Sequence, residues 1–385
     1  MRTFLHSCGA AILSSTVLLS QQTVDPNEFA KLEPVLQKAL KVAAPFVVTV
    51  ETFGGTRKVL VEGGGAIDSA GPGRPGKPGG KQPGGMKDPG FHQAQGRSAG
   101  ITISKDGWIL VSRFALNYDP TSILVTIPGG KTLTAQRKGE DTSRNIALLK
   151  VDAQDLPVAE FVQPKDVRVG QWSFALGRTF GVDEPTVHIG IVSALRRQFG
   201  RALQIDAYTS PANYGGAVID IQGRVLGIAV PLSPAGRDAG VEWYDSGIGF
   251  AATIADIPDL IERMKNGEVL HRGWLGVGLE NSHLGPGAKL SNTPKDGVAA
   301  KAGLRKGDII LEIDGVKVLN GPHLQMLIGG RMGGDPVGLK EKSKNAPEPV
   351  SLTVILADTP EAEREQNKEA ELPASFSLPE KPEGR

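Results

Sequence analysis

Between Ala99 and Ala252 the sequence is a succession of short β-type runs, each followed by a turn, with no long helical pattern between them. The runs are rich in aliphatic side chains. They are residues 107–112, 122–127, 146–151, 172–176, 187–193 and 224–230. Strands at this spacing, without helices between them, are typical of a β-barrel or a β-sandwich. The sequence therefore predicts a mainly β fold.

The amino-acid composition is typical of such a fold, and the balanced charge gives no indication of nucleic acid or membrane binding. A chain of 385 residues suits two folded domains. It has 43 basic and 42 acidic residues, so no general attraction to nucleic acid or to an anionic membrane surface is expected. The 50 glycines and the low aromatic content of 5% favour a Gly-rich strand fold over a helical bundle.

Residues 1–21 have the features of a signal peptide. Arg2 supplies a positive start, and residues 10–20 are apolar but too few to span a bilayer. We expect cleavage near Ser20, with an uncleaved anchor as the alternative. The only cysteine, Cys8, lies in this segment, so the mature chain would have no disulfide and no thiol chemistry.

Three further segments are assigned from local patterns. Residues 22–44 are expected to hold an N-terminal helix, with Asp25 as its cap and Pro26 at its first position. Residues 63–98 are rich in Gly and Pro, and we expect a flexible loop inserted between strands. Residues 359–385 are rich in Glu, Lys and Pro, which predicts a disordered tail.

Six segments in a fixed order carry a family resemblance. They are AGITISKDGW from Ala99, NIALLKV from Asn145, ALGRTFG from Ala175, GIVSA from Gly190, QIDAYTSPANYGGA from Gln204 and GIGFA from Gly247. In order and spacing they resemble the HtrA/Deg family of trypsin-like serine proteases. The resemblance covers about residues 45–357. It implies two six-stranded β-barrels in residues 45–262, with the active site between them.

The resemblance also locates the catalytic triad, and all three positions carry other residues. A serine protease needs a nucleophile, an imidazole base and a carboxylate that orients the base. Phe114 stands at the position of the family's His, Asn145 at that of the Asp and Tyr214 at that of the Ser. Ala212 replaces the glycine of the oxyanion loop, and its side chain disfavours the turn that presents the amide.

Two other interpretations of these residues stay open. In one, Phe114 and Tyr214 are ordinary core or turn residues of an unrelated β protein. In the other, the alignment is shifted and a nearby serine, Ser112, Ser143 or Ser210, is the nucleophile. The second interpretation lacks a base, because the two histidines of the barrel region, His92 and His188, lie in the inserted loop and in a strand away from the family's site.

A further block, residues 272–358, resembles the PDZ domain that follows the protease in this family, after a linker in residues 263–271. HRGWLGV from His271, GVAAKAGLRKGDIILEIDG from Gly297 and SLTVIL from Ser351 carry this resemblance. A PDZ domain, a small β-barrel with helices, captures an extended C-terminus as an added strand. The implied peptide-binding residues are Trp274, Leu275, Gly276, Val277, Leu324 and Leu327. Residues 329–349 begin GGRMGGDPV and continue with a polar insertion whose role is not readable.

The resulting hypothesis is an exported, periplasmic or extracellular pseudoprotease that acts as a peptide-binding scaffold or regulatory subunit through its PDZ domain. Its partners would be protein C-termini or unfolded polypeptides, and fold analogy suggests a homo-trimer or a mixed oligomer with an active paralogue. The alternative is an active serine endopeptidase of envelope protein quality control. The histidines do not have metal-ligand spacing, and no nucleotide motif is present, so no metal or other cofactor is expected.

The resemblance makes one geometric prediction. The His and Ser side chains touch in the family fold, so the rings of Phe114 and Tyr214 should lie about 4.5–7 Å apart and fill the former cleft.

Overall fold

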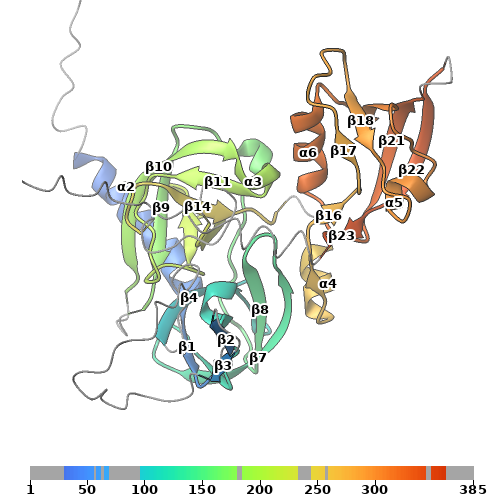
Figure 1. The fold of residues 1–385 in the computed structure, drawn as a ribbon. Helices are drawn as coiled ribbons and strands as arrows, with labels where there is room; N and C mark the ends of the chain where they lie inside the picture. The colour runs from blue at the N-terminus through green and yellow to red at the C-terminus, as the bar shows by residue number, and fades with distance from the viewer. Residues whose placement is uncertain are drawn as a thin grey trace, which may run out of the picture.

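The computed structural model describes residues 30–55, 96–179, 184–232, 244–255, 259–343 and 348–360, and the backbone of residues 58–61 and 65–68. Two barrels lie together, and a third domain lies beside them (Figure 1). The predicted signal peptide, most of the inserted loop and nearly all of the predicted tail lie outside the described residues. No helix within the described ranges is long and apolar enough to cross a bilayer.

The first barrel has six strands in the order β7-β6-β1-β4-β5-β8, and the pairing of β7 with β8 closes it. Its strands are β1 (Val47–Phe53), β4 (Gly96–Thr102), β5 (Trp108–Ser112), β6 (Ser122–Thr126), β7 (Thr132–Asp141) and β8 (Ile146–Val151). Alternate side chains such as Val48, Val50 and Ile109 are fully buried in one apolar cluster. The other face of β1 is buried as well, since Val47 is 0% exposed and belongs to a second apolar cluster.

The second barrel is closed in the order β10-β11-β14-β13-β12-β9. Its strands are β9 (Trp172–Gly177), β10 (Thr186–Arg196), β11 (Ala202–Ile205), β12 (Ala217–Ile219), β13 (Val225–Val230) and β14 (Gly249–Ala252). Val192, Leu203 and Ile205 belong to its own buried cluster. The predicted pair of six-stranded barrels is confirmed.

A third apolar cluster joins the barrels and the N-terminal helix. It includes Leu110 and Ile146 from the first barrel and Phe174 and Ile228 from the second. Helix α2 (Leu32–Ala43) adds Ala39 to this cluster and packs on β12. The helix predicted in residues 22–44 is therefore present, although its expected start at Asp25 lies outside the described residues. A 3-10 turn, η1 (Ala44–Phe46), follows it.

The inserted loop is shorter than the predicted range of residues 63–98. Strands β2 (Lys58–Val61) and β3 (Gly65–Asp68) pair as an antiparallel hairpin at its start. At its end, β4 already begins at Gly96, which pairs with Thr52 of β1. The predicted loop was wrong at both ends. Its Gly-rich composition gives no strand signal, yet β3 pairs with the neighbouring β2 and β4 pairs with the distant β1.

The predicted linker in residues 263–271 is largely ordered. Helix α4 (Leu260–Lys265) packs against β7, and β15 (Val269–Leu270) pairs in parallel with the end of β7. Leu270 is 2% exposed and belongs to the cluster that joins the barrels. The burial of this leucine explains why the segment follows the first barrel instead of crossing solvent.

The third domain contains a sheet in the order β17-β18-β19-β21-β22, with β20 paired to β19 and β16 paired to β23. Its elements are β16 (Gly273–Trp274), β17 (Gly278–Leu279), β18 (Ala288–Asn292), α5 (Val298–Lys301), β19 (Ile309–Ile313), β20 (Val316–Lys317), α6 (Gly321–Gly329), β21 (Pro336–Lys342), β22 (Val350–Ile355) and β23 (Ala357–Asp358). It has its own apolar cluster.

The boundary of the third domain differs from the prediction at the C-terminal side. The tail was predicted from residue 359, but Thr359 is 6% exposed and donates its backbone N–H to the carbonyl of Arg272 at 2.9 Å. Its hydroxyl donates to the same carbonyl at 2.8 Å. These long-range hydrogen bonds fix a residue whose local sequence is polar.

Glu341 on β21 is a buried carboxyl in the third domain. Its side chain is 8% exposed, and its Oε2 atom has no hydrogen-bond partner within the described part of the chain. Burial raises the pKa of this carboxyl above its ordinary value of 4.5, and the nearby Asp308 raises it further. Ionisation is therefore less favourable in the folded domain than in the unfolded chain.

This burial predicts a pH dependence of stability. A raised folded-state pKa stabilises the fold below the ordinary pKa, and that contribution is lost as the pH rises through the raised value. The free energy of unfolding of the third domain should fall over this window, and Glu341→Gln should remove the fall. Chemical denaturation at a series of pH values measures it, with Glu348→Gln at an exposed position as control. Identical pH slopes in the parent and Glu341→Gln would contradict the prediction.

Candidate active site and peptide groove

The three predicted triad positions come together where the two barrels meet. Phe114 lies in a 3-10 turn, η2 (Arg113–Leu116), which begins because the Ser112 hydroxyl accepts the Phe114 N–H at 3.2 Å. Asn145 directly precedes β8, and Tyr214 closes a turn just before β12. Their exposed fractions are 1%, 2% and 2%, so no part of this trio is open to solvent.

The rings of Phe114 and Tyr214 are in contact. Their centroids lie 5.3 Å apart with an interplanar angle of 68°, an edge-to-face arrangement. Tyr244 packs on Tyr214 in the same manner, at 6.0 Å and 70°. The predicted approach of Phe114 to Tyr214 is confirmed, and three aromatic rings fill this part of the junction between the barrels.

Asn145 has a structural role in the turn beside the rings. It adopts a left-handed backbone with φ of 57°, which Asn tolerates better than most residues. Its carbonyl accepts the Arg113 N–H at 2.9 Å and the Ser112 hydroxyl at 3.3 Å. The main-chain carbonyl of Asn145 thus holds the turn that carries Phe114. Its side-chain Oδ1 accepts the Ser112 hydroxyl at 3.4 Å, and this neutral amide supplies no charge to stabilise an imidazolium.

The backbone amides of the turn in residues 210–214 are engaged internally. The N–H groups of Asn213 and Tyr214 both donate to the Ser210 carbonyl, at 3.0 and 3.2 Å. The Asn213 side chain closes the turn by accepting the Ser210 N–H at 2.9 Å. An oxyanion hole needs amides aimed at the substrate, so in this conformation the Tyr214 amide cannot serve as one. Ala212, the replaced glycine position, lies in this same turn.

Two of the serines weighed as alternative nucleophiles are held in hydrogen bonds of the fold. Ser112 is 1% exposed and donates to Asn145. Ser143 donates its hydroxyl to Asp141 at 2.6 Å. The ring of His188 on β10 packs against Tyr208, with centroids 6.3 Å apart. None of these contacts joins a serine hydroxyl to an imidazole.

Charged groups near the site stabilise the turn that carries Phe114. Arg113 lies 3.2 Å and Arg137 2.7 Å from the carboxylate of Glu140, which is 6% exposed. Burial alone would raise the pKa of Glu140, but the two guanidinium groups outweigh it and hold the pKa below its ordinary value. Glu140 therefore stays ionised and anchors Arg113, the neighbour of Phe114.

The predicted peptide-binding residues divide into two groups. Leu275 and Leu324 are 3% and 1% exposed and belong to the core of the third domain. Trp274, Val277 and Leu327 are partly exposed. The two leucines are therefore core residues, and the other three present surface.

Gly276 in the same loop has a backbone conformation that requires glycine. Its φ is 69°, and an added Cβ would lie 2.9 Å from the Trp274 ring. The indole thus covers the glycine, and any side chain at this position would displace it.

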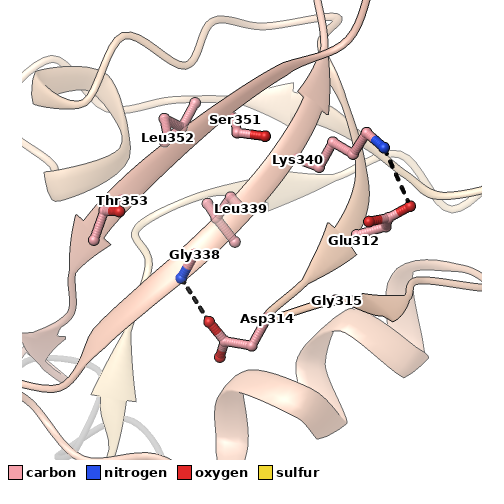
Figure 2. Close-up of a pocket in the computed structure, with 9 residues that line it drawn as sticks. All are labelled: Glu312, Asp314, Gly315, Gly338, Leu339, Lys340, Ser351, Leu352 and Thr353. Atoms are coloured by element: carbon pink, nitrogen blue, oxygen red, sulfur yellow. Dashed lines mark hydrogen bonds and ion pairs between the residues drawn. The ribbon is translucent and has the colours of Figure 1, made fainter.

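A hollow of about 440 Å³ lies elsewhere on the third domain (Figure 2). Residues of β19, β21 and β22 line it, and none of its lining residues belongs to β17 or α6. Lys340 and Glu312 form an ion pair at 3.5 Å across it, and Asp314 accepts the Gly338 N–H at 2.8 Å (Figure 2). Both polar residues and the leucines Leu339 and Leu352 line it, and it is distinct from the predicted groove.

Neither the contact of Tyr244 with Tyr214 nor the hydrogen bond of the Tyr214 amide could be predicted from sequence. Tyr244 stands in an irregular segment, and no periodicity marks it as a neighbour of Tyr214. Ala212 was expected to disfavour the turn that presents an oxyanion amide, and the structure adds that the Tyr214 N–H donates to the Ser210 carbonyl.

Two family models match the chain. A trypsin-like peptidase domain matches residues 99–228, and a PDZ domain matches residues 294–335. Curated relatives carry the name "Probable periplasmic serine endoprotease DegP-like". The one from Halomonas elongata is 33% identical over 290 residues, which is 71% of this chain and 59% of the relative. The one from Pseudomonas fluorescens is 34% identical over 68% of this chain and 56% of the relative. The chain thus matches less than two thirds of the length of these relatives.

Solved structures of similar fold cover 84% of the chain. HtrA-type protease AlgW with decapeptide has a TM-score of 0.59 and 25% identity, over 99% of that protein. AlgW with tripeptide has a TM-score of 0.61 at 24% identity, over 97% of that protein. The serine endoprotease from Yersinia pestis has a TM-score of 0.55 at 24% identity, over 98% of that protein.

The aromatic contacts predict a cost for removing the central ring. Tyr214→Ser should lower the free energy of unfolding of the double barrel by about 2–4 kcal/mol, because it leaves a cavity between the two neighbouring rings. Tyr214→Phe keeps both ring contacts and should cost clearly less. Chemical denaturation of the three proteins tests this. Equal stability of the Ser and Phe variants would mean that the ring does not hold the barrels together.

Proposed function

Because this chain belongs to the HtrA/Deg family of trypsin-like proteins with a PDZ domain, we propose that it is a non-catalytic, peptide-binding member of that family. It would act as a scaffold or regulatory subunit, and the PDZ domain would provide its activity. The relatives are named as periplasmic proteins, and we assign this chain to the same compartment.

The observation that carries the proposal is the buried contact between Phe114 and Tyr214. Acyl transfer needs a hydroxyl beside a proton acceptor. A phenyl ring accepts no proton, and its contact with Tyr214 occupies the place where a substrate carbonyl would approach. The internal hydrogen bond of the Tyr214 amide removes the electrostatic stabilisation that survives in some triad variants.

The proposed ligand is a free C-terminus with an apolar last residue. Trp274, Val277 and Leu327 offer partly exposed apolar surface, and the loop that contains Trp274 and Val277 stands where the PDZ resemblance places the backbone amides that bind a terminal carboxylate. The solved relative AlgW has been described with a tripeptide and with a decapeptide, which supports peptide capture in this kind of protein. Assembly as a homo-trimer or with an active paralogue stays a prediction from fold analogy.

A second candidate function is that of the curated relatives, an active serine endopeptidase. Their names favour it. It would require a nucleophile and a base other than the family's, and Ser210, which lies in the same turn as Tyr214, is the candidate nucleophile. The two candidates differ in a direct test of hydrolysis.

We predict no peptidase activity on unfolded casein and no labelling by a fluorophosphonate probe. The reason is the absence of a hydroxyl–imidazole pair at Phe114 and Tyr214. Ser210→Ala serves as the matched variant, because it removes the alternative nucleophile and keeps the aromatic rings. Stoichiometric labelling of the parent that Ser210→Ala abolishes would establish the endopeptidase instead.

We also predict that the full chain binds peptides through their C-termini. Binding should be of about micromolar strength, near 8 kcal/mol, and should be lost when the peptide carboxylate is amidated. Leu327→Asp should weaken binding, whereas Ile355→Asp, on an exposed edge strand outside β17 and α6, should not. Isothermal titration with paired free and amidated peptides measures both effects. Equal binding of the two peptide forms would rule out the proposed recognition.

A further inference from the structure

One short segment of the PDZ domain receives contacts from both barrels and from α4. It consists of residues 329–335, and we call it the docking segment. It begins at the C-terminal end of α6 and leads into β21. Its sequence, GGRMGGD, contains four glycines. The proposed peptide-binding role assigns nothing to this segment.

Met332 joins the docking segment to the core of the barrels. It is 1% exposed and lies in the apolar cluster that holds the two barrels together, not in the cluster of the PDZ domain. Leu270 belongs to the same cluster. The Met332 sulfur is 4.0 Å from the Ser143 hydroxyl and 4.0 Å from the Arg144 guanidinium. A PDZ residue thus completes a core that is otherwise built from other parts of the chain.

Phe199 covers the first residue of the docking segment from the second barrel. It lies in α3 (Arg197–Gly200), beside α6 (Figure 1), and an added Cβ on Gly329 would be 2.3 Å from the Phe199 Cβ. The Arg272 guanidinium stacks over the Phe199 ring at 4.8 Å. Phe199 as a whole is 38% exposed.

The backbone that presents Phe199 is strained. Arg196, Gln198 and Phe199 all have left-handed backbones, with φ of 54°, 54° and 57°. Left-handed conformations are unfavourable for residues with a Cβ, and they persist where surrounding contacts impose them. The contact with Gly329 is one such contact, and it admits no side chain larger than hydrogen.

Two arginines bind carbonyl groups of the docking segment. Arg144 is 2% exposed and donates to the Gly330 carbonyl at 3.2 Å, to the Thr253 carbonyl at 3.0 Å and to the Asp141 carboxylate at 2.9 Å. A buried guanidinium is stable only when such partners satisfy it. Arg263 of α4 donates to the Gly333 carbonyl at 3.2 Å. The segment is therefore held by the first barrel, the second barrel and α4 at once.

From these contacts we propose that the docking segment clamps the PDZ domain to the double barrel as one rigid body. Interdomain motion is the ordinary expectation for a small polar interface, whereas a shared buried core opposes it. Because α6 ends in the docking segment, the clamp also fixes the direction of the α6 groove relative to the barrels. This holds whether or not the groove binds peptides.

The test is a distance measurement between spin labels on the full chain. The native cysteine is removed as Cys8→Ser, and labels are placed at Ile189→Cys on β10 and Val316→Cys on β20, which are 50% and 48% exposed. The parent should give one narrow distance distribution. Met332→Ala and Phe199→Ala should each broaden it about two-fold or more, by releasing the domain.

Three controls keep the result interpretable. Met332→Leu preserves the buried volume and should keep the narrow distribution. Ile355→Ala lies outside the clamp and should also keep it. Circular dichroism shows whether each variant is folded. If either alanine variant unfolds, Arg144→Lys replaces it in the test. Lysine keeps the charge but loses the forked hydrogen bonds of the guanidinium, so this variant should broaden the distance distribution. A broad distribution in the parent, or narrow distributions in all folded variants, would overturn the proposal.

Discussion

The apolar cluster shared by the two barrels is the interaction on which the rest of this structure depends. Leu110 and Ile146 on one side and Phe174 and Ile228 on the other remove the facing surfaces of both barrels from water. Such burial is the dominant favourable term in folding. The rings of Phe114 and Tyr214 contribute further buried surface at the same junction. The positions of Phe114 and Tyr214, which carry polar catalytic groups in proteases of this fold, are here part of the hydrophobic interior.

This change has a thermodynamic consequence as well as a chemical one. Active sites keep polar groups and space that cost stability, and filling them is a common way to gain it. In this chain the aromatic contacts and the hydrogen bonds of Asn145 hold the loops around the former site in place. The same contacts therefore stabilise the double barrel that carries the PDZ domain.

The strands of both barrels could be predicted from sequence because the apolar, β-branched pattern of a strand is visible within a few consecutive residues. Strand β8 (Ile146–Val151) appears in the structure with the bounds that the pattern gave. It failed where a long-range contact decides the outcome. The strand Val269–Leu270 was assigned to a linker, since its partner β7 lies far away in the chain. Thr359 is ordered for the same reason, through the carbonyl of Arg272.

The sequence by itself determined which chemical groups stand at the three triad positions, because Phe, Asn and Tyr have their properties wherever they are placed. Only the tertiary structure decided that the rings of Phe114 and Tyr214 meet, that Tyr244 joins them and that the Tyr214 amide turns to Ser210. The tertiary structure likewise decided that Met332 of the PDZ domain is buried in the apolar cluster that joins the barrels. Side-chain chemistry is local, whereas burial and contact arise from segments that only the folded chain brings together.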